Sequence, residues 1–210
     1  FLEKTQDKPV VGIGHSQGAT ATAIAAAKRP DLFYQLYLIE PVTFTKSQKL
    51  VMDLIPSRLK VGQEPFKSTL AKQAKWQSVD DYYEYLRAHR AFKRIGDEHL
   101  SVFAKNSLVQ EGEGYRLLFT PEQELASYFD TPFVNDALKT LNNKAFPYTI
   151  IIGKPSIFIS HKVRKVWQNL VPSEQIIELS DNGHLLPMEA PEHCANIIIE
   201  KFNNSMGDVF

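Results

Sequence analysis

The stretch that most constrains the fold of this chain is a tight turn at residues 14–18, which read Gly-His-Ser-Gln-Gly. The apolar run at residues 8–13 predicts a buried strand before the turn, and the alanine-rich residues 19–29 predict a helix after it. A serine in a sharp turn between a strand and a helix has strained backbone angles. We therefore expect positions 14 and 18 to require glycine, because a side chain at either position would clash within the turn. Such a turn points the serine hydroxyl away from the sheet, at the start of a helix, where free N–H groups favour negative charge.

A second stretch with chemical content lies near the other end of the chain, at residues 176–192. It is a β-rich run that ends in a polar turn, Ser-Asp-Asn-Gly, followed by His184 and the sequence Leu-Leu-Pro-Met-Glu-Ala-Pro-Glu. An ordinary strand-to-helix turn would explain residues 14–18 on their own, but it does not explain why this histidine block accompanies them. We therefore interpret the two stretches together.

The turn around Ser16 and the block around His184 resemble the α/β-hydrolase superfamily, in the capped branch that includes esterases, C–C bond hydrolases, epoxide hydrolases and haloalkane dehalogenases. The Gly-x-Ser-x-Gly pentapeptide corresponds to the nucleophile elbow of that superfamily. The resemblance covers nearly the whole chain and implies an α/β fold, with a parallel sheet flanked by helices and a helical cap insertion. In that superfamily several strands precede the elbow, whereas only about a dozen residues do here. We therefore expect the C-terminal portion of the fold, without the loop that usually donates one of the two oxyanion-hole N–H groups.

The order of the predicted elements divides the chain into two domains. A strand at residues 34–39 follows the alanine-rich helix, and this strand–helix–strand order implies a right-handed crossover and a parallel sheet. Residues 43–140 are more polar and look helical, and the resemblance identifies them as a cap or lid that shapes the substrate pocket. Residues 1–42 and 141–210 then form the partial hydrolase core. Further predicted elements are strands at 148–153 and 176–179, core helices at 163–170 and 191–203, and cap helices that begin near residues 78, 97 and 121.

The acid that would support His184 is the one group for which the sequence departs from the pattern of the superfamily. A serine is activated only if a base takes its proton, and a histidine base needs a carboxylate to hold its ring. The usual position of that carboxylate follows the strand that ends at Gly153, but Ser156 stands there and no carboxylate occurs before Glu174. We favour Glu40 instead, because it ends the strand after the elbow helix, where some haloalkane dehalogenases place their acid.

Three alternatives to this assignment stay open. Glu40 could be a salt-bridge partner at the hinge of the cap. Asp181 is the second choice for the acid, although it lies only three residues before His184, where we expect it to shape the turn. A water molecule held by Ser156, on the usual side of the site, is the remaining candidate.

The resemblance implies a cofactor-free serine hydrolase that acts on a small molecule. Ser16 would attack an ester-like or activated carbonyl and form an acyl-enzyme, with His184 as general base and then general acid. Glu40 would orient His184, and the backbone N–H of Gln17 would donate to the oxyanion. Serine at the elbow disfavours epoxide hydrolase and dehalogenase chemistry, for which the resembling proteins use aspartate, whereas acyl transfer and C–C bond hydrolysis stay open. The alternative is a catalytically inactive fragment or a binding module that lacks a complete oxyanion hole.

Composition argues against several other classes of protein. The 24 basic residues equal the 24 acidic ones, which argues against a nucleic-acid or acidic-membrane binder. The sequence contains no apolar run of membrane-spanning length, no signal peptide at its start and no metal-ligand spacing, so we expect a cytoplasmic protein without a metal. The single Cys194 cannot form an internal disulfide, and the apolar spacing around it predicts a core position. An unpaired strand edge at residues 9–13 would favour a homodimer.

Other residues of interest receive structural interpretations. His15 adjoins the elbow serine, and we interpret it as a hydrogen-bonded scaffold residue. The remaining histidines fall in presumed helices or at their ends, without a carboxylate or cysteine at ligand spacing. Six aromatic residues of the cap could line an apolar pocket, but packing of the cap onto the main domain is the interpretation we favour for any single one. The histidines are His89, His99, His161 and His193, and the aromatic residues are Trp76, Tyr82, Tyr83, Tyr85, Phe92 and Phe103.

Overall fold

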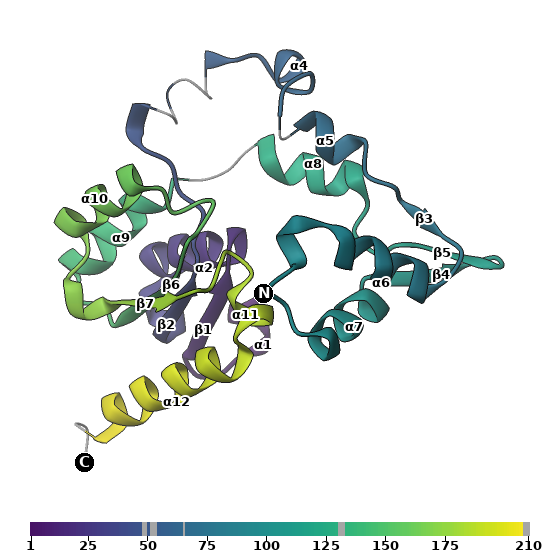
Figure 1. Ribbon diagram of the computed structural model, residues 1–210. Helices are drawn as coiled ribbons and strands as arrows, with labels where there is room; N and C mark the ends of the chain where they lie inside the picture. Colours follow the sequence, from purple (N-terminus) through teal and green to yellow (C-terminus); the bar gives the residue numbers. More distant parts are fainter. Residues whose placement is uncertain (48–49, 51–53, 65, 130–132, 208–210) are drawn as a thin grey trace. The chain divides into compact units, whose positions relative to one another are not determined.

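The chain divides into two compact units, shown in the ribbon diagram of Figure 1. The first unit comprises Phe1–Lys46 and Pro132–Phe210, and the second comprises Ser47–Thr131. The first contains a parallel sheet, and the second is mainly helical. The computed structural model describes residues 1–47, 50, 54–64, 66–129 and 133–207.

The first unit is built on a four-stranded parallel sheet with the strand order β1-β2-β6-β7 (Figure 1). The two inner strands are almost continuous apolar runs, as expected for strands that are covered on both faces. This arrangement confirms the predicted α/β fold with a parallel sheet flanked by helices. The strands are β1 (Val10–His15), β2 (Phe33–Ile39), β6 (Tyr148–Lys154) and β7 (Ile176–Ser180).

Successive side chains of the inner strands point to opposite faces of the sheet, and each face has its own helices. Leu36, Leu38 and Ile150 share a buried cluster with residues of α2, α9 and α10. The intervening Ile39 and Ile151 share another cluster with residues of α11 and α12. The sheet is therefore the middle of three layers. The helices of this unit are α1 (Leu2–Thr5), α2 (Gln17–Lys28), α9 (Val134–Asn143), α10 (His161–Leu170), α11 (Leu186–Glu189) and α12 (Pro191–Gly207), with short 3₁₀ turns η1 (Pro30–Leu32) and η3 (Ser173–Gln175).

Two features of this unit bear on the sequence expectations. The run at residues 8–13 forms a strand at one end of the strand order, in keeping with the expected strand edge, and Ile13 is 56% exposed, although a buried strand was predicted, because β1 pairs with only one of the described strands. Most of helix α9 lies in the stretch expected to form the cap, residues 43–140, yet Val134 and Leu138 are buried in the core of the first unit. An amphipathic helix joins whichever domain covers its apolar face, and local sequence does not specify that partner.

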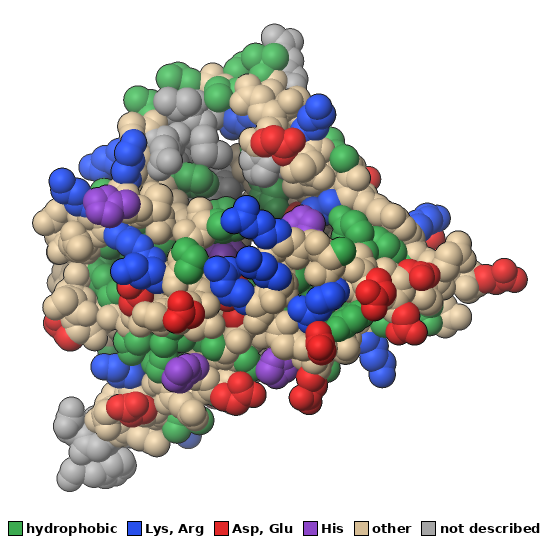
Figure 2. Space-filling model, in the orientation of Figure 1, with side chains coloured by type: hydrophobic (Ala, Val, Ile, Leu, Met, Phe, Trp, Pro, Cys, Tyr) green, Lys and Arg blue, Asp and Glu red, His purple; other side chains and the backbone are tan. Residues whose placement is uncertain are grey.

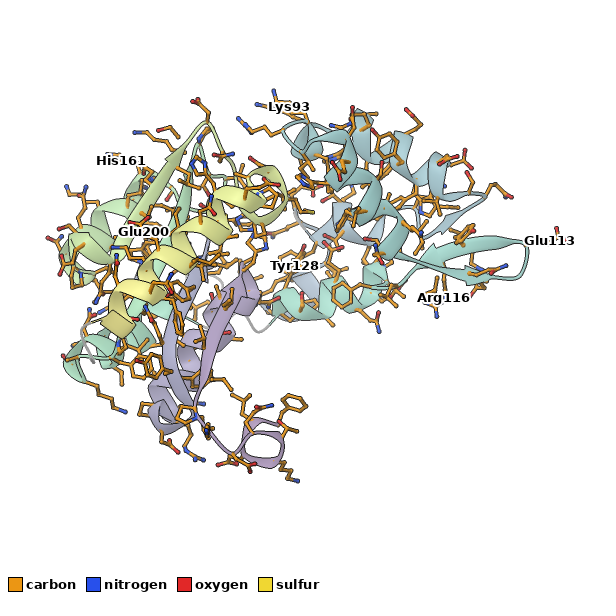
Figure 3. All side chains as sticks on the ribbon, turned by 90° about the horizontal axis from the view of Figure 1, so that it is seen from below. Lys93, Glu113, Arg116, Tyr128, His161 and Glu200 are labelled. Atoms are coloured by element: carbon orange, nitrogen blue, oxygen red, sulfur yellow. The ribbon has the colours of Figure 1, made fainter. Side chains whose placement is uncertain are left out.

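The second unit combines short helices with a small antiparallel sheet in the order β3-β5-β4. Ser78 caps α6 as predicted, because its hydroxyl accepts the backbone N–H of Asp81 at 3.0 Å. The hairpin of β4 and β5 turns at Gly112, which has a positive φ of 64°, and carries Glu113 at its tip (Figure 3). The elements are β3 (Lys75–Trp76), β4 (Leu108–Glu111), β5 (Gly114–Leu117), α4 (Ser57–Lys60), α5 (Phe66–Leu70), α6 (Val79–Ala88), η2 (Arg90–Phe92), α7 (Asp97–Asn106) and α8 (Pro121–Phe129).

The aromatic residues of the second unit pack largely on one another. The ring of Trp76 lies 5.0 Å from that of Tyr82 and 4.9 Å from that of Tyr85, centroid to centroid. Trp76 and Tyr82 are buried, and burial raises the pKa of Tyr82 to about 12. The rings of Phe92 and Phe103 form a further pair at 5.8 Å. Trp76 and Tyr82 therefore contribute to the core of their own unit.

The surface carries both signs of charge, and acidic and basic side chains both occur on the face in Figure 2. None of the helices in the described ranges is long and apolar enough to cross a membrane. Cys194 lies inside, beside Ile151 and Leu186, and burial raises the pKa of its thiol. The predicted core position of Cys194 is thus confirmed.

Candidate active site

Ser16 occupies the sharp turn between β1 and α2. Its φ of 56° and ψ of −123° are strained for a residue with a side chain, which confirms the predicted backbone strain. The turn is held in part by β2, since the Ser16 N–H donates to the carbonyl of Ile39 at 2.9 Å. The requirement for glycine holds at only one of the two predicted positions. A Cβ at Gly14 would lie 2.7 Å from the backbone of Ala19, whereas a Cβ at Gly18 would meet nothing described within 4 Å, because that position faces open space.

Glu40 follows β2 and is completely buried. Its backbone has a φ of 48°, which is held by a bond from its N–H to the carbonyl of Ile151 at 2.8 Å. One carboxylate oxygen, Oε1, accepts the backbone N–H of Gly153 at 2.6 Å. The other, Oε2, accepts the hydroxyl of Ser156 at 2.5 Å. A buried carboxylate is tolerated when donors satisfy it in this way.

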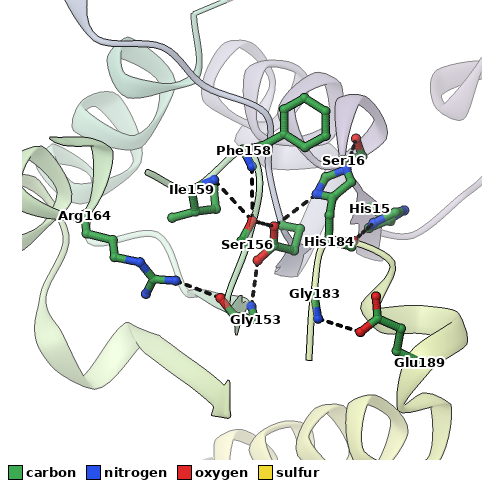
Figure 4. A network of polar contacts seen from close by, with 11 residues as sticks. His15, Ser16, Gly153, Ser156, Phe158, Ile159, Arg164, Gly183, His184 and Glu189 are labelled. Carbon is green, nitrogen blue, oxygen red and sulfur yellow. Dashed lines mark hydrogen bonds and ion pairs between the residues drawn. The ribbon is translucent and has the colours of Figure 1, made fainter. Parts of the chain in front are cut away.

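His184 lies between the other two groups (Figure 4). Its Nε2 is 2.9 Å from Ser16 Oγ, and its Nδ1 is 3.0 Å from Glu40 Oε2. The turn that carries it is braced by the carboxylate of Glu189, which accepts the N–H of Gly183 at 2.5 Å. Three residues from distant parts of the chain thus form one hydrogen-bonded series at the carboxyl ends of β1, β2 and β7.

Asp181, the second choice for the acid, has a different place. It is exposed in the turn after β7 and takes a positive φ of 65°, and its N–H donates to the carbonyl of Lys154 at 2.8 Å. The carboxylate that faces Nδ1 of His184 is that of Glu40. Asp181 therefore shapes the turn, as the sequence indicates.

His15 supports the His184 backbone. Its Nε2 lies 2.7 Å from the carbonyl oxygen of His184, so Nε2 carries the proton and donates it. Burial lowers the pKa of His15, and the bond to this carbonyl opposes the shift only in part. The interpretation of His15 as a hydrogen-bonded scaffold residue is confirmed, with the backbone of His184 as its partner.

The remaining predicted positions are less informative. Gln17 is the first residue of α2, and the first backbone N–H groups of a helix are not bonded within the helix itself. The oxyanion role of Gln17 stays a prediction. His89 accepts the N–H of Ala91 at 3.2 Å, and His161 begins α10. Within the described ranges, no group of three or more His, Cys, Asp or Glu side chains could hold a metal ion.

Sequence reasoning missed two contributions to the site. Gly153 and Ser156 hold the Glu40 carboxylate directly, whereas Ser156 was considered from the sequence only as the occupant of the usual acid position and as a residue that could hold a water molecule there. Phe158 packs against the ring of His184, with 4.3 Å between ring centroids. The available signal was the position of these residues at the carboxyl end of β6 or just after it, since functional groups gather at such strand ends.

A parallel, helix-flanked sheet with a strained serine turn and a histidine at its carboxyl edge defines an α/β-hydrolase type of protein. Comparison with known families agrees with this class: the family described as alpha/beta hydrolase fold matches residues 1–191. The chain belongs to this family, and the membership indicates a hydrolase.

Similar proteins extend the comparison. An abhydrolase domain-containing protein, AKT2 of Alternaria alternata, is 23% identical over 92% of this chain and 82% of its own length. The uncharacterized hydrolase YugF of Bacillus subtilis (strain 168) is 24% identical over 94% of this chain and 68% of its own. The crystal structure of E-2-(acetamidomethylene)succinate hydrolase superposes with a TM-score of 0.74 at 18% identity, over 96% of this chain and 69% of that one.

Proposed function

We propose that this protein is a serine hydrolase that cleaves an ester-like or activated carbonyl bond through Ser16, His184 and Glu40. The observation that carries the proposal is the continuous series of hydrogen bonds from Ser16 Oγ through both ring nitrogens of His184 to the Glu40 carboxylate. A serine becomes a strong nucleophile only beside a base and a carboxylate, because the base takes its proton and the carboxylate stabilises the resulting imidazolium.

The reaction begins when Ser16 Oγ attacks the carbonyl carbon and its proton passes to Nε2 of His184. Glu40 accepts the Nδ1–H of the imidazolium and stabilises its charge, and it holds the tautomer in which Nε2 is free to act as base. The oxyanion develops near the start of α2, where the backbone N–H of Gln17 would donate to it. His184 then protonates the leaving group, and a water molecule activated by the same histidine releases the acyl group from Ser16.

We further propose that the second unit, Ser47–Thr131, is the cap of this hydrolase. Support comes from its place in the chain, inserted into the first unit shortly after the strand that ends before Glu40. Its mainly helical content is also typical of such an insertion. The substrate is proposed to be a small molecule, in keeping with hydrolase family membership.

Covalent labelling tests the proposal. A fluorophosphonate probe should add once to the folded protein, and Ser16→Ala should abolish the adduct in intact-mass analysis. The exposed Ser173 supplies a matched control, since Ser173→Ala should label like the parent protein. Turnover of a reactive ester should fall by on the order of a millionfold in Ser16→Ala. Folded protein without an adduct, or unchanged labelling of Ser16→Ala, would contradict the proposal.

A further inference from the structure

An exposed apolar side chain lies directly beside the general base of the proposed reaction. The ring of Phe158 stands at 59° to that of His184, with 4.3 Å between their centroids (Figure 4). Phe158 is nevertheless 41% exposed, and its neighbour in sequence, Ile157, is 79% exposed. An isolated exposed apolar residue needs no explanation, but Phe158 packs against the ring whose Nε2 faces Ser16 Oγ.

The loop that carries Phe158 is anchored on both sides. The Ser156 hydroxyl accepts the backbone N–H groups of Phe158 at 3.3 Å and of Ile159 at 3.2 Å, while it donates to Glu40. The side chain of Ile159 is buried in the core of the first unit. One hydroxyl therefore ties the position of Phe158 to that of the proposed acid, so the ring is held in place before a substrate arrives.

Proton transfer determines which part of a substrate would meet this ring. In acylation the bond from Ser16 Oγ to the carbonyl carbon forms, the bond from that carbon to the leaving oxygen breaks, and His184 Nε2 gives its proton to that oxygen. The leaving group must then lie within hydrogen-bond reach of Nε2. A group in that position lies beside the His184 ring, against which Phe158 packs.

We propose that Phe158, extended by Ile157, forms the leaving-group wall of the site, and that the preferred substrates are esters of alkyl or aryl alcohols. This inference rests on the proposed function. An apolar alcohol would cover ring surface that is otherwise exposed, and each fully buried methylene contributes about fourfold to binding. The acyl substituent lies on the other side of the carbonyl carbon from the leaving oxygen, so we expect no gain from this wall along an acyl series.

Two ester series separate the leaving group from the acyl group. The first keeps acetate and varies the alcohol from methanol through butanol and hexanol to benzyl alcohol. The second keeps ethanol and lengthens the acyl chain from acetyl to hexanoyl. Within the first series every substrate gives the same acetyl-enzyme, so differences in kcat/KM arise in the acylation step.

Phe158→Ala should lower kcat/KM about tenfold for hexyl and benzyl acetates and less than twofold for methyl acetate, and it should leave the acyl series parallel to that of the parent. Phe158→Leu should recover most of the preference. The exposed Ile199 of α12 provides the control, since Ile199→Ala should leave both series unchanged.

Three outcomes would overturn the inference while leaving the proposed function standing. One is an equal loss across all esters in both variants of Phe158, which would mean that the ring only supports His184. Another is a loss confined to the acyl series. The third is a large fall in Tm with uniform loss, which would mean that the ring is a packing residue. Parent protein that neither hydrolyses any ester nor reacts with the fluorophosphonate would overturn the proposed function and this inference together.

Discussion

Replacing Glu40 with glutamine keeps the size of the side chain but changes one carboxylate oxygen into a donor. In the native site three donors converge on the Glu40 carboxylate: the Gly153 N–H on Oε1, and Ser156 and His184 on Oε2. An amide nitrogen placed at Oε1 would face the fixed N–H of Gly153. Placed at Oε2 it would face the Ser156 hydroxyl, whose proton can turn away, and the ring of His184, which can change tautomer to accept. The second placement is therefore the less costly one.

That placement disables the base. The glutamine N–H₂ would donate to Nδ1 of His184, which moves the ring proton to Nε2, so that Nε2 can no longer take the proton of Ser16. The corresponding change in serine proteases lowers turnover about ten-thousandfold. We expect kcat to fall by about a hundredfold to ten-thousandfold, which is about 3 to 5 kcal/mol of transition-state stabilisation. KM should change little, because the lost interaction strengthens only in the transition state.

Steady-state hydrolysis of a reactive ester at neutral pH measures this change, with the fluorophosphonate labelling rate as a second readout. Asp181→Asn is the matched control: it also neutralises a carboxylate, and asparagine tolerates the positive φ of 65° at that position. We expect Asp181→Asn to retain most of the activity. The reasoning is refuted if folded Glu40→Gln stays within a few-fold of the parent, or if Asp181→Asn loses as much.

Three further predictions concern the frame of the site. Gly14→Ala should destabilise the protein by roughly 1–3 kcal/mol in urea unfolding because its Cβ would meet the Ala19 backbone, whereas Gly18→Ala should be neutral or slightly stabilising; equal effects would contradict this. The pKa of His15 is lowered in the folded protein, so as the pH falls the unfolded chain binds a proton at this histidine before the folded protein does. The stability that neutral His15 contributes is therefore fully present above about pH 6.5 and declines as the pH falls from there towards the folded-state pKa. His15→Gln should therefore show a smaller drop in urea midpoint between about pH 7.5 and pH 5.5 than the parent, and an identical drop would argue against it. Ser156→Ala should lower kcat about tenfold by removing a donor to the Glu40 carboxylate, with recovery in Ser156→Thr, and a variant as active as the parent would refute that role.

Local patterns were enough to predict most elements of the first unit. The strain at Ser16 follows from a serine between an apolar strand and an alanine-rich helix, and it is present as a φ of 56°. The apolar run at residues 148–153 is the inner strand β6, and the final helix buries Cys194 as its spacing indicates. These features depend on neighbours within a few residues, so periodicity and composition carry them.

Other features depended on partners that local sequence does not name. The exposure of Ile13 follows from the position of β1 at one end of the strand order. Residues 134–140, most of helix α9, were expected in the cap, but the apolar face of this helix is buried in the core of the first unit. The small sheet of the second unit joins residues 75–76 to residues 108–117, and local sequence does not specify that pairing of distant segments.

By itself, the sequence determined that a serine on a strained turn and a histidine after a strand belong to one α/β hydrolase, and it named Glu40 and Asp181 as rival acids. Only the tertiary structure decided which carboxylate faces Nδ1 of His184. The register of β2 on β6, with Ile39 opposite Ile151, brings Glu40 to the Gly153 N–H and the Ser156 hydroxyl. Contacts across more than a hundred residues depend on how strands are ordered and aligned in the sheet, and no local propensity encodes that alignment.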